Sequence, residues 1–290
     1  MKELLIVSGK GGTGKTSITA AFASLAENKV MVDCDVDAAD LHLILKPKIE
    51  IKNDFYGGKE AKIVSELCTK CGKCEELCVF DAITNFTVNG IKCEGCGVCH
   101  YFCPSKAILF EDKLSGEWYE SNTRFGKLVH AKLGVAEENS GKLVAKIRSH
   151  ARAVAEADKS SLIIVDGSPG IGCPVIASMT GTDLVLIIVE PTLSGIHDAE
   201  RVIELTDHFG IPACVCINKY DINIELSNKI ESFCKRKGLF FAGKVSYSED
   251  FTKAQIKEKT IVEYSDGETS NEIKTLWKNI EAKLKEKKDA

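Results

Sequence analysis

The chain has 290 residues, of which 44% are hydrophobic and 28% are charged, so it can form a folded core of one large or two smaller domains. Its formal net charge of −4 argues against a general nucleic-acid-binding protein, a class that is usually basic. No signal-peptide pattern follows Met1, and the longest apolar run, residues 184–189, is far shorter than the ~18 residues of a membrane helix. We therefore expect a cytoplasmic protein with no membrane span. In a reducing compartment, clustering among its 13 cysteines indicates metal binding rather than disulfides.

The N-terminal part of the chain alternates between strand and helix patterns. An apolar run at residues 4–7 predicts a strand, and a glycine-rich loop follows at residues 8–14. A helix is expected over residues 16–27 and a second strand over residues 29–34. This βαβ pattern with short loops predicts a parallel sheet and a right-handed crossover.

The same alternation returns in the C-terminal half of the chain. Buried strands are expected at residues 161–165, 184–189 and 213–217, and helices between them near residues 195–209 and 222–235. The simplest interpretation is one α/β domain that is interrupted by an insert.

The cysteines gather between residues 58 and 112, where the alternation stops. The segment from Cys68 to Ile83 aligns with that from Cys93 to Ile108 at an offset of 25 residues, and seven of sixteen aligned positions are identical, including every cysteine. We therefore expect a main domain of residues 1–57 and 113–290, with residues 58–112 as the inserted domain. Segments 117–120 and 128–130 are candidates for a hairpin that leads back to the main domain.

A phosphate-binding loop follows the first predicted strand. The run from Gly9 to Thr16 matches the P-loop pattern, with a strand before it and a helix after it. Its glycines let backbone N–H groups surround a phosphate chain, and the helix N-terminus adds positive potential. Lys15 is expected to reach the β- and γ-phosphates, and the Thr16 hydroxyl to bind Mg²⁺. The expected nucleotide-binding residues here are Gly9, Gly11, Gly12, Thr13, Gly14, Lys15, Thr16 and Ser17.

An additional lysine gives this loop a family resemblance. The form Lys-Gly-Gly-x-Gly-Lys-Thr, which begins at Lys10, resembles the deviant Walker A loop of the MinD/ParA/nitrogenase iron protein superfamily. The resemblance implies a mainly parallel α/β P-loop NTPase fold that binds ATP and Mg²⁺. It also implies that Lys10 reaches across a nucleotide-sandwich homodimer to the partner's phosphates, so that ATP closes the dimer. A solvated loop charge is the alternative interpretation of Lys10.

Two further segments resemble the switch regions of this superfamily. Residues 33–41 resemble the first switch, which implies that Asp35 lies near Mg²⁺ and the attacking water, although Asp33 competes for this catalytic role. Residues 164–170 resemble the Walker B strand and the second switch. This resemblance implies that Asp166 holds Mg²⁺ through water and that the backbone of Gly167 senses the γ-phosphate.

The run Asn218-Lys-Tyr-Asp221 follows a predicted strand and resembles the base-recognition loop of the superfamily. The resemblance implies that Asn218 contacts adenine and that Asp221 belongs to the same site.

The repeated pattern C-x-x-C-x-x-C-x-x-x-C is that of a bacterial-type ferredoxin with two [4Fe–4S] clusters. Thiolates are soft ligands that suit iron, and in this pattern the remote fourth cysteine binds the other cluster. One cluster is therefore expected on Cys68, Cys71, Cys74 and Cys103, and the other on Cys93, Cys96, Cys99 and Cys78. Zinc is the competing interpretation, but structural zinc sites usually pair two C-x-x-C motifs.

Five cysteines lie outside the repeat. Cys34, Cys214, Cys216 and Cys234 lie in strand or helix patterns and are expected to be buried structural thiols. Cys173 follows Asp166 by seven residues, and the nitrogenase iron protein has a cysteine at the corresponding place that ligates a cluster between its subunits. This makes Cys173 a candidate interface metal ligand, with a packed or redox-silent thiol as the alternative.

A C-terminal helix is expected with one apolar face, formed by Ile273, Leu276, Trp277, Ile280 and Leu284. MinD ends in a membrane-binding helix, so membrane attachment is one interpretation. Docking of the helix on its own domain is the favoured one.

The whole chain resembles MinD-superfamily P-loop ATPases that carry an inserted ferredoxin domain. The resemblance implies a Mg²⁺-dependent ATPase, slow without its partner, with two [4Fe–4S] clusters. We consider three functions: ATP-gated electron transfer to a partner protein, iron–sulfur cluster or metallocentre delivery to an apo-enzyme, and redox-sensing recruitment of a partner. Eight ferredoxin-type ligands hold clusters tightly, which favours electron transfer.

Overall fold

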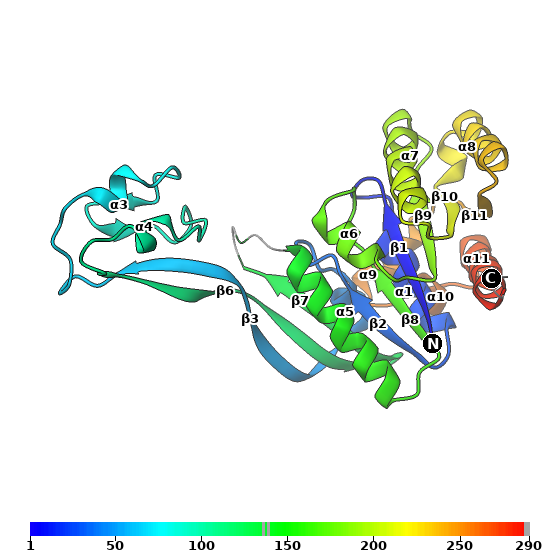
Figure 1. Cartoon of the computed structure of the whole chain (residues 1–290). Helices are drawn as coiled ribbons and strands as arrows, with labels where there is room; N and C mark the ends of the chain where they lie inside the picture. Colours follow the sequence, from blue (N-terminus) through cyan, green and yellow to red (C-terminus); the bar gives the residue numbers. More distant parts are fainter. Residues whose placement is uncertain (135–136, 138–139, 287–290) are drawn as a thin grey trace. The chain divides into compact units, whose positions relative to one another are not determined.

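A computed structural model describes residues 1–134, 137 and 140–286 and divides the chain into two compact units (Figure 1). The P-loop unit comprises Met1–Lys52, Trp118–Lys132 and the chain from Ser140 onward. The cysteine-rich unit comprises Asn53–Glu117 and a short segment that begins at Leu133. The second unit therefore contains every residue of the insert expected from the sequence.

A nine-stranded sheet with the order β11-β10-β9-β1-β8-β2-β7-β6-β3 forms the centre of the fold. Each neighbouring pair of strands from β11 across to β7 is parallel, as the βαβ pattern predicts. The strands of the sheet are β1 (Lys2–Ser8), β2 (Lys29–Asp33), β3 (Lys48–Ile63), β6 (Ile108–Thr123), β7 (Gly126–Leu133), β8 (Leu162–Asp166), β9 (Leu184–Val189), β10 (Ala213–Asn218) and β11 (Phe240–Val245). The carboxyl ends of β1, β2 and β8 carry the predicted phosphate-binding and switch residues to one edge of the sheet.

Helices cover both faces of the sheet, which explains why the central strands are continuous apolar runs. One face is covered by α1 (Lys15–Leu25), α2 (Leu41–Leu45), α10 (Ile261–Tyr264) and α11 (Glu268–Lys285). The other is covered by α5 (Ser140–Ala157), α6 (Cys173–Met179), α7 (Leu193–His208) and α8 (Ile224–Lys237). The short elements η1 (Tyr220–Ile222) and α9 (Asp250–Ile256) lie in the loops that follow β10 and β11.

The C-terminal helix α11 packs on its own domain. Its apolar face joins the core formed by α1 and the sheet, and the rings of Trp277 and Phe22 lie 5.0 Å apart. Ile273 and Ile280 on the same face are fully buried. This packing agrees with the favoured interpretation of the helix, because the apolar face already has a partner. Among the described residues, no helix is long and apolar enough to cross a bilayer.

The cysteine-rich unit repeats its structure as it repeats its sequence. Each half has one short helix, α3 (Lys73–Glu76) or α4 (Val98–Tyr101), and the two helices contact each other. Each helix follows a left-handed glycine, Gly72 at φ +78° or Gly97 at φ +76°, which lies between the second and third cysteines of its repeat. The unit also contains an antiparallel pair, β4 (Ile83–Thr84) and β5 (Thr87–Val88).

The structure confirms the expected strands and helices of the P-loop unit to within a few residues. The expected hairpin is formed by the ends of β6 and β7, which a two-residue connection joins. The length of β3 and β6, 16 residues each, is not predicted by the sequence analysis. Both strands start or end in the P-loop unit and continue into the cysteine-rich unit.

Candidate functional site

The loop between β1 and α1 has the backbone geometry that a P-loop requires. Gly12 and Gly14 adopt positive φ angles of +79° and +86°. A Cβ atom on Gly14 would lie 2.4 Å from the Nδ2 atom of Asn218, so a side chain there would also collide with its neighbour. Asn218 Nδ2 donates a hydrogen bond to the Thr13 carbonyl at 2.7 Å, which fixes the loop to the end of β10.

Lys15 lies among the carboxylates of the expected Mg²⁺ site. Its ammonium nitrogen is 2.9 Å from Asp166 Oδ1 and 3.5 Å from Asp35 Oδ2. Burial alone would lower the pKa of Lys15, but Asp166, Asp35 and Asp33 raise it above its ordinary value. The lysine is therefore charged at neutral pH, as phosphate binding requires.

Two threonine hydroxyl groups contact the carboxylate of Asp166 at the end of β8. Thr16 Oγ1 donates to one carboxylate oxygen and Thr19 Oγ1 approaches the other, each at 2.8 Å. Asp166 and Thr19 are fully buried. Carboxylate and hydroxyl oxygens are hard ligands of the kind that Mg²⁺ prefers, so Thr16 and Asp166 fit the metal role expected of them. Thr19 is a contact that the motifs do not predict.

The two aspartates of the first switch have different surroundings. The buried carboxylate of Asp33 accepts hydrogen bonds from the backbone N–H groups of Asp35, at 3.1 Å, and Leu41, at 3.2 Å. Burial and the neighbouring Asp166 raise the pKa of Asp33 well above its ordinary value. Asp33 therefore shapes the switch, whereas Asp35 faces the pocket described below.

Asp35 is the more suitable of the two for chemistry. Burial raises the pKa of Asp35 to about 6, while Lys15 acts in the opposite direction. Its carboxylate is thus mostly ionised at neutral pH and lines the pocket that also contains Lys15 and Thr16. This arrangement is consistent with the preference for Asp35 over Asp33.

Lys10 is held within its own chain. Its ammonium group is 3.2 Å from Glu190 and also contacts the hydroxyl groups of Thr192 at 3.3 Å and Ser194 at 3.5 Å. Glu190 also binds Lys219 at 2.5 Å, and Lys219 in turn donates to the Gly12 carbonyl at 3.3 Å. The P-loop and the start of α7 are therefore joined by side-chain contacts.

A cavity of about 640 Å³ lies over the P-loop, a volume typical of small-molecule sites. Its lining includes P-loop residues 11–17, the switch residue Asp35, and Asn218. The buried Thr13 hydroxyl and the Asn218 carbonyl oxygen have no hydrogen-bond partner among the described residues. Buried polar groups without a partner are costly, so the cavity fits a polar ligand.

Three predicted nucleotide-binding residues do not line this cavity in the described part of the chain. Gly9 packs against α7, because an added Cβ would lie 2.5 Å from Asp198. The Gly167 N–H donates to the Ile6 carbonyl at 2.8 Å, so in this structure it is occupied by a bond to β1. Asp221 accepts a hydrogen bond from the Tyr247 N–H at 2.7 Å and thus holds the loop after β11.

The loop after β11 contributes residues that the sequence analysis missed. Tyr247, Ser248, Phe251 and Gln255 line the cavity, and Gln255 Nε2 donates to the Ser17 hydroxyl at 2.9 Å. These residues carry no motif. Only their position after the last parallel strand, at the carboxyl edge of the sheet, would have indicated them.

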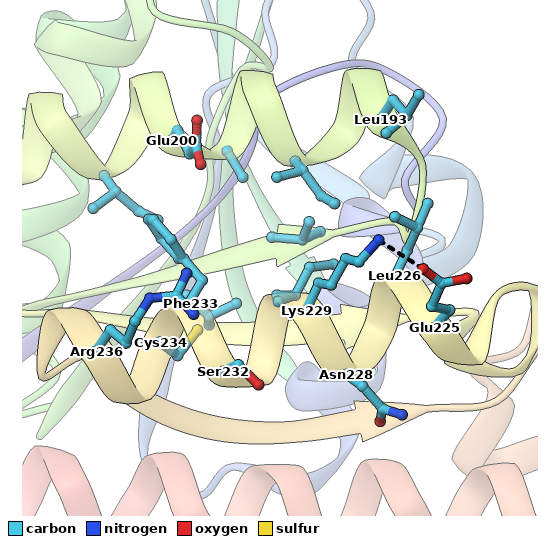
Figure 2. A pocket seen from close by; sticks show the side chains of 16 residues that line it. Leu193, Glu200, Glu225, Leu226, Asn228, Lys229, Ser232, Phe233, Cys234 and Arg236 are labelled. Carbon is cyan, nitrogen blue, oxygen red and sulfur yellow. Dashed lines mark hydrogen bonds and ion pairs between the residues drawn. The ribbon is translucent and has the colours of Figure 1, made fainter.

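A second cavity of about 610 Å³ lies between α7 and α8 and is shown in Figure 2. Its lining is mostly apolar, with Leu193, Leu226 and Phe233 among the contributing side chains, and a Lys229–Glu225 ion pair of 2.7 Å lies at its border. Cys234 contacts this cavity. None of the residues predicted to bind nucleotide or iron lines it.

The cysteines of the repeat form two groups in the cysteine-rich unit. Cys68, Cys71, Cys74 and Cys103 line one small cavity. Burial raises the pKa of Cys99, and the thiols of Cys93, Cys96 and Cys78 raise it further, so these four interact. The grouping is the one that the ferredoxin pattern predicts, with the fourth cysteine exchanged between the repeats.

Backbone N–H groups point at the exchanged cysteines in both halves. The Ala82 N–H donates to Cys78 Sγ at 3.4 Å, and the Ala107 N–H donates to Cys103 Sγ at 3.3 Å. These pairs are equivalent positions of the repeat. Such N–H···S bonds stabilise thiolates and are one of the factors that set the potential of an iron–sulfur cluster. The donor set therefore fits thiolate-bound iron.

The described residues do not form a site with three or more ligands for a single metal ion. Within residues 1–134, 137 and 140–286, no three His, Cys, Asp or Glu side chains lie close enough to hold one metal ion. A structural zinc site needs four ligands around one ion. The cysteines around a cluster are bound to different iron atoms and lie farther apart.

The other cysteines follow the sequence analysis closely. Cys34, Cys214, Cys216 and Cys234 are buried, as expected of structural thiols. Cys173 is exposed and is the first residue of α6. Its proposed metal role rests on resemblance alone.

Comparison with known proteins places this geometry in a family. The model of the CobQ/CobB/MinD/ParA nucleotide binding domain matches residues 4–261. The chain belongs to this family. An uncharacterized protein of Methanocaldococcus jannaschii is 37% identical over 225 residues, which cover 76% of this chain and 79% of the relative.

MinD proteins share the fold. MinD of Pyrococcus horikoshii, solved with Mg-ADP, matches with a TM-score of 0.62 at 14% identity and covers 98% of this chain and 97% of its own. MinD in the MinC:MinD complex of Aquifex aeolicus matches with a TM-score of 0.60 at 18% identity, covering 97% and 96%. The family's mainly parallel α/β P-loop fold, predicted from the sequence, is thus confirmed.

A shorter match is to a ferredoxin. Ferredoxin-1 of Caulobacter vibrioides is 36% identical over 74 residues, which cover 23% of this chain and 66% of that protein. The likeness points to iron–sulfur binding as the hypothesis to be tested for the cysteine-rich unit.

Proposed function

We propose that the chain is a Mg²⁺-dependent ATPase with two [4Fe–4S] clusters, in which the nucleotide state of a homodimer gates electron transfer from the clusters to a partner protein. One observation carries the proposal: a single chain combines the P-loop site with two groups of four cysteines, each with an N–H···S bond at the same position of the repeat. Membership of the family supports ATP binding and hydrolysis.

The P-loop site accounts for phosphate and metal binding. Lys15 neutralises the β- and γ-phosphates, while the Thr16 hydroxyl and, through water, Asp166 hold Mg²⁺. When bound, Mg²⁺ supplies positive charge that stabilises the charge developing on the transferred phosphoryl group. Asp35 orients the attacking water from the first switch, and Thr19 keeps the Asp166 carboxylate in position.

The environment of Asn218 supports the proposed preference for adenine. Its Nδ2 atom donates to the Thr13 carbonyl, and its buried Oδ1 atom accepts no hydrogen bond from any residue that the structure describes. Adenine presents an exocyclic amino donor, whereas guanine presents a carbonyl acceptor at the same ring position. With guanine, the Oδ1 acceptor of Asn218 would face the carbonyl acceptor of the base, and neither would gain a hydrogen bond. ATP is therefore preferred over GTP.

Lys10 provides the link between nucleotide and dimer. Homologues of the MinD/ParA type form nucleotide-dependent dimers. In the single chain Lys10 is bound to Glu190, Thr192 and Ser194. Transfer of Lys10 from these groups to the phosphates of a partner protomer would couple ATP binding to dimer closure.

The clusters are assigned to the cysteine-rich unit. Cys68, Cys71, Cys74 and Cys103 hold one cluster, and Cys93, Cys96, Cys99 and Cys78 the other. Clusters of this type supply one-electron transfer at low potential.

The test is an anaerobic redox titration monitored by electron paramagnetic resonance, first with ADP and then with a non-hydrolysable ATP analogue. Two [4Fe–4S]⁺ signals whose potential or line shape changes with the ATP analogue support gated electron transfer. Two stable clusters whose potential and line shape do not change with the nucleotide contradict gated electron transfer. They favour cluster delivery or partner recruitment. Reconstituted protein without clusters contradicts the assignment of the cysteines.

A further inference from the structure

The turn that follows the exchanged cysteine has the same backbone in both repeats. The Lys106 N–H donates to the Cys103 carbonyl at 3.2 Å, and the Asp81 N–H, at the equivalent position, donates to the Cys78 carbonyl at 3.2 Å. Lys106 and Asp81 adopt left-handed φ angles of +51° and +50°. The N–H···S bonds described above are also nearly equal in length in the two turns. The backbone therefore gives the two exchanged sulfur atoms closely similar surroundings.

One side chain of this turn differs in a way that affects the sulfur. Ser105 in the second repeat stands where the first repeat has Phe80. The Ser105 hydroxyl oxygen lies 3.6 Å from Cys103 Sγ, a distance at which the large sulfur atom can accept a hydrogen bond. An iron-bound thiolate carries no proton, so the hydroxyl is the donor. The ring of Phe80 has no such donor, and within the described residues Cys78 Sγ accepts only the Ala82 N–H.

Exchange of the fourth cysteine assigns this hydroxyl to one of the two cysteine groups. The first group consists of Cys68, Cys71, Cys74 and Cys103, and the second of Cys93, Cys96, Cys99 and Cys78. Ser105 lines the small cavity of the first group. Each group has one exposed cysteine and three of intermediate exposure, and residues of both charges occur in both repeats. Among the described residues, Ser105 provides the only side-chain hydrogen bond to a sulfur of either group, so the groups match in exposure but differ in hydrogen bonding.

A hydrogen bond to a thiolate ligand affects how readily its cluster accepts an electron. Reduction adds one electron without a change of bond or proton, and part of the added negative charge lies on the thiolate sulfurs. A donor stabilises the more negative state more strongly, so it raises the reduction potential of the cluster. Pro104, directly before Ser105, fixes its own φ at about −65° and so restricts the turn that carries the hydroxyl, whereas the equivalent Val79 does not.

We propose that the Ser105 hydroxyl donates to the Cys103 thiolate and makes the cluster of the first group the more readily reduced of the two. The first electron from a one-electron donor then resides on the first group, and the cluster of the second group, which is reduced last, is the stronger reductant. Ser105 is a positioning residue, because it acts through Cys103 and not as an iron ligand. This inference rests on the two clusters of the proposed function and does not depend on gating by ATP.

The first experiment is an anaerobic redox titration of the full chain with sodium dithionite as the electron donor, monitored by electron paramagnetic resonance. The parent chain should show two midpoint potentials. S105A should lower the higher one, so that the ratio of reduced to oxidised cluster at a fixed potential falls roughly fivefold, which is about 40 mV for one electron. S105T keeps the hydroxyl and should retain the parent value. The control S65A removes an exposed hydroxyl that makes no hydrogen bond within the described residues, and it should change neither potential.

The reciprocal variant F80S places a hydroxyl at the equivalent position of the other turn and should raise the lower potential. Electron–nuclear double resonance of the reduced protein in D₂O gives a second readout. S105A, but not S65A, should lose one exchangeable deuteron that is coupled to a cluster.

Iron content is measured first for every variant. A parent chain without about eight iron atoms contradicts the proposed function itself. With both clusters present, equal midpoint potentials in the parent chain, or an S105A variant in which neither potential changes, would overturn the role of Ser105. If S105A does not hold its clusters, F80S still tests the inference, because an unchanged lower potential in that variant contradicts it.

Discussion

The ammonium nitrogen of Lys10 lies 3.2 Å from the carboxylate of Glu190 in the same chain. This contact competes with any contact between Lys10 and a second protomer. In the proposed dimer the free energy of closure would include the cost of breaking this contact, so that Glu190 would set how readily ATP brings two chains together.

Substitution Glu190→Gln should favour the dimer. Without the carboxylate Lys10 loses its ion pair, and a partly exposed pair of this kind is worth up to about 1 kcal/mol. Because each of the two protomers has to break its own pair, the substitution should lower the dimer dissociation constant by up to roughly thirtyfold. Sedimentation equilibrium with a non-hydrolysable ATP analogue measures the change. Lys219→Met is the control, because it removes the other partner of Glu190 and leaves the Lys10 contact in place. Equal dimerisation of E190Q and the parent chain would show that the contact does not restrain Lys10.

Substitution Asp35→Asn should abolish ATP hydrolysis and stabilise the nucleotide-free fold. Burial raises the pKa of Asp35 to about 6 from an ordinary value of 3.8, so ionisation costs folding free energy. The favourable contribution of the protonated group is fully present below pH 4 and is lost as the pH rises through 6. At pH 8 the variant should therefore be more stable by about 1–3 kcal/mol, and the difference should disappear near pH 4. Urea denaturation at the two pH values checks this, and a variant less stable at pH 8 would contradict it.

Substitution Cys103→Ser should remove one cluster. Cys103 shares its cavity with three other cysteines and accepts the Ala107 N–H. Iron per chain should fall from about eight atoms to about four, because each cluster contains four. Cys173→Ser, which changes an exposed cysteine outside the repeat, should retain about eight. Iron analysis and the intensity of the paramagnetic signal give the result. Loss of iron in the Cys173 variant would instead support the interface metal role.

Substitution Trp277→Ala should destabilise the P-loop unit. Trp277 is 6% exposed and its ring packs on Phe22. Its removal leaves a cavity, which should lower the free energy of unfolding by about 3–5 kcal/mol. Lys278→Ala, on the exposed side of the same helix, should change the free energy of unfolding by no more than about 0.5 kcal/mol. Urea denaturation is the measurement. An unchanged stability together with weaker binding to anionic lipid vesicles would favour the membrane interpretation of α11.

Short sequence patterns predict those parts of the molecule whose structure depends on residues close together in the chain. The P-loop needs glycines at positive φ followed by Lys15 and Thr16, and such a run is rare by chance. The cysteine repeat is equally specific, because its spacing is that of the bacterial ferredoxin pattern. Both the parallel sheet and the grouping of cysteines follow from these patterns without long-range information.

Contacts between distant segments account for what the sequence did not predict. The residues of β3 from Lys48 to Lys52 are exposed and rich in charge, and their strand identity comes from pairing with β6, about 60 residues later in the chain. Tyr247 and Gln255 reach the cavity because the segment after β11 extends to the P-loop, where Gln255 contacts Ser17, and no short motif predicts this. The contact of Asp221 with the Tyr247 N–H is of the same kind.

The close approach of Gly14 to the side chain of Asn218 has a consequence for evolution. The glycine is required by the protein's own packing as well as by any phosphate, since a methyl group there would meet the amide at 2.4 Å. A smaller residue at position 218 would remove that collision but not the strain of a side chain at a φ of +86°, so two independent causes require glycine at position 14. Relatives are therefore expected to keep this glycine whatever residue they have at position 218.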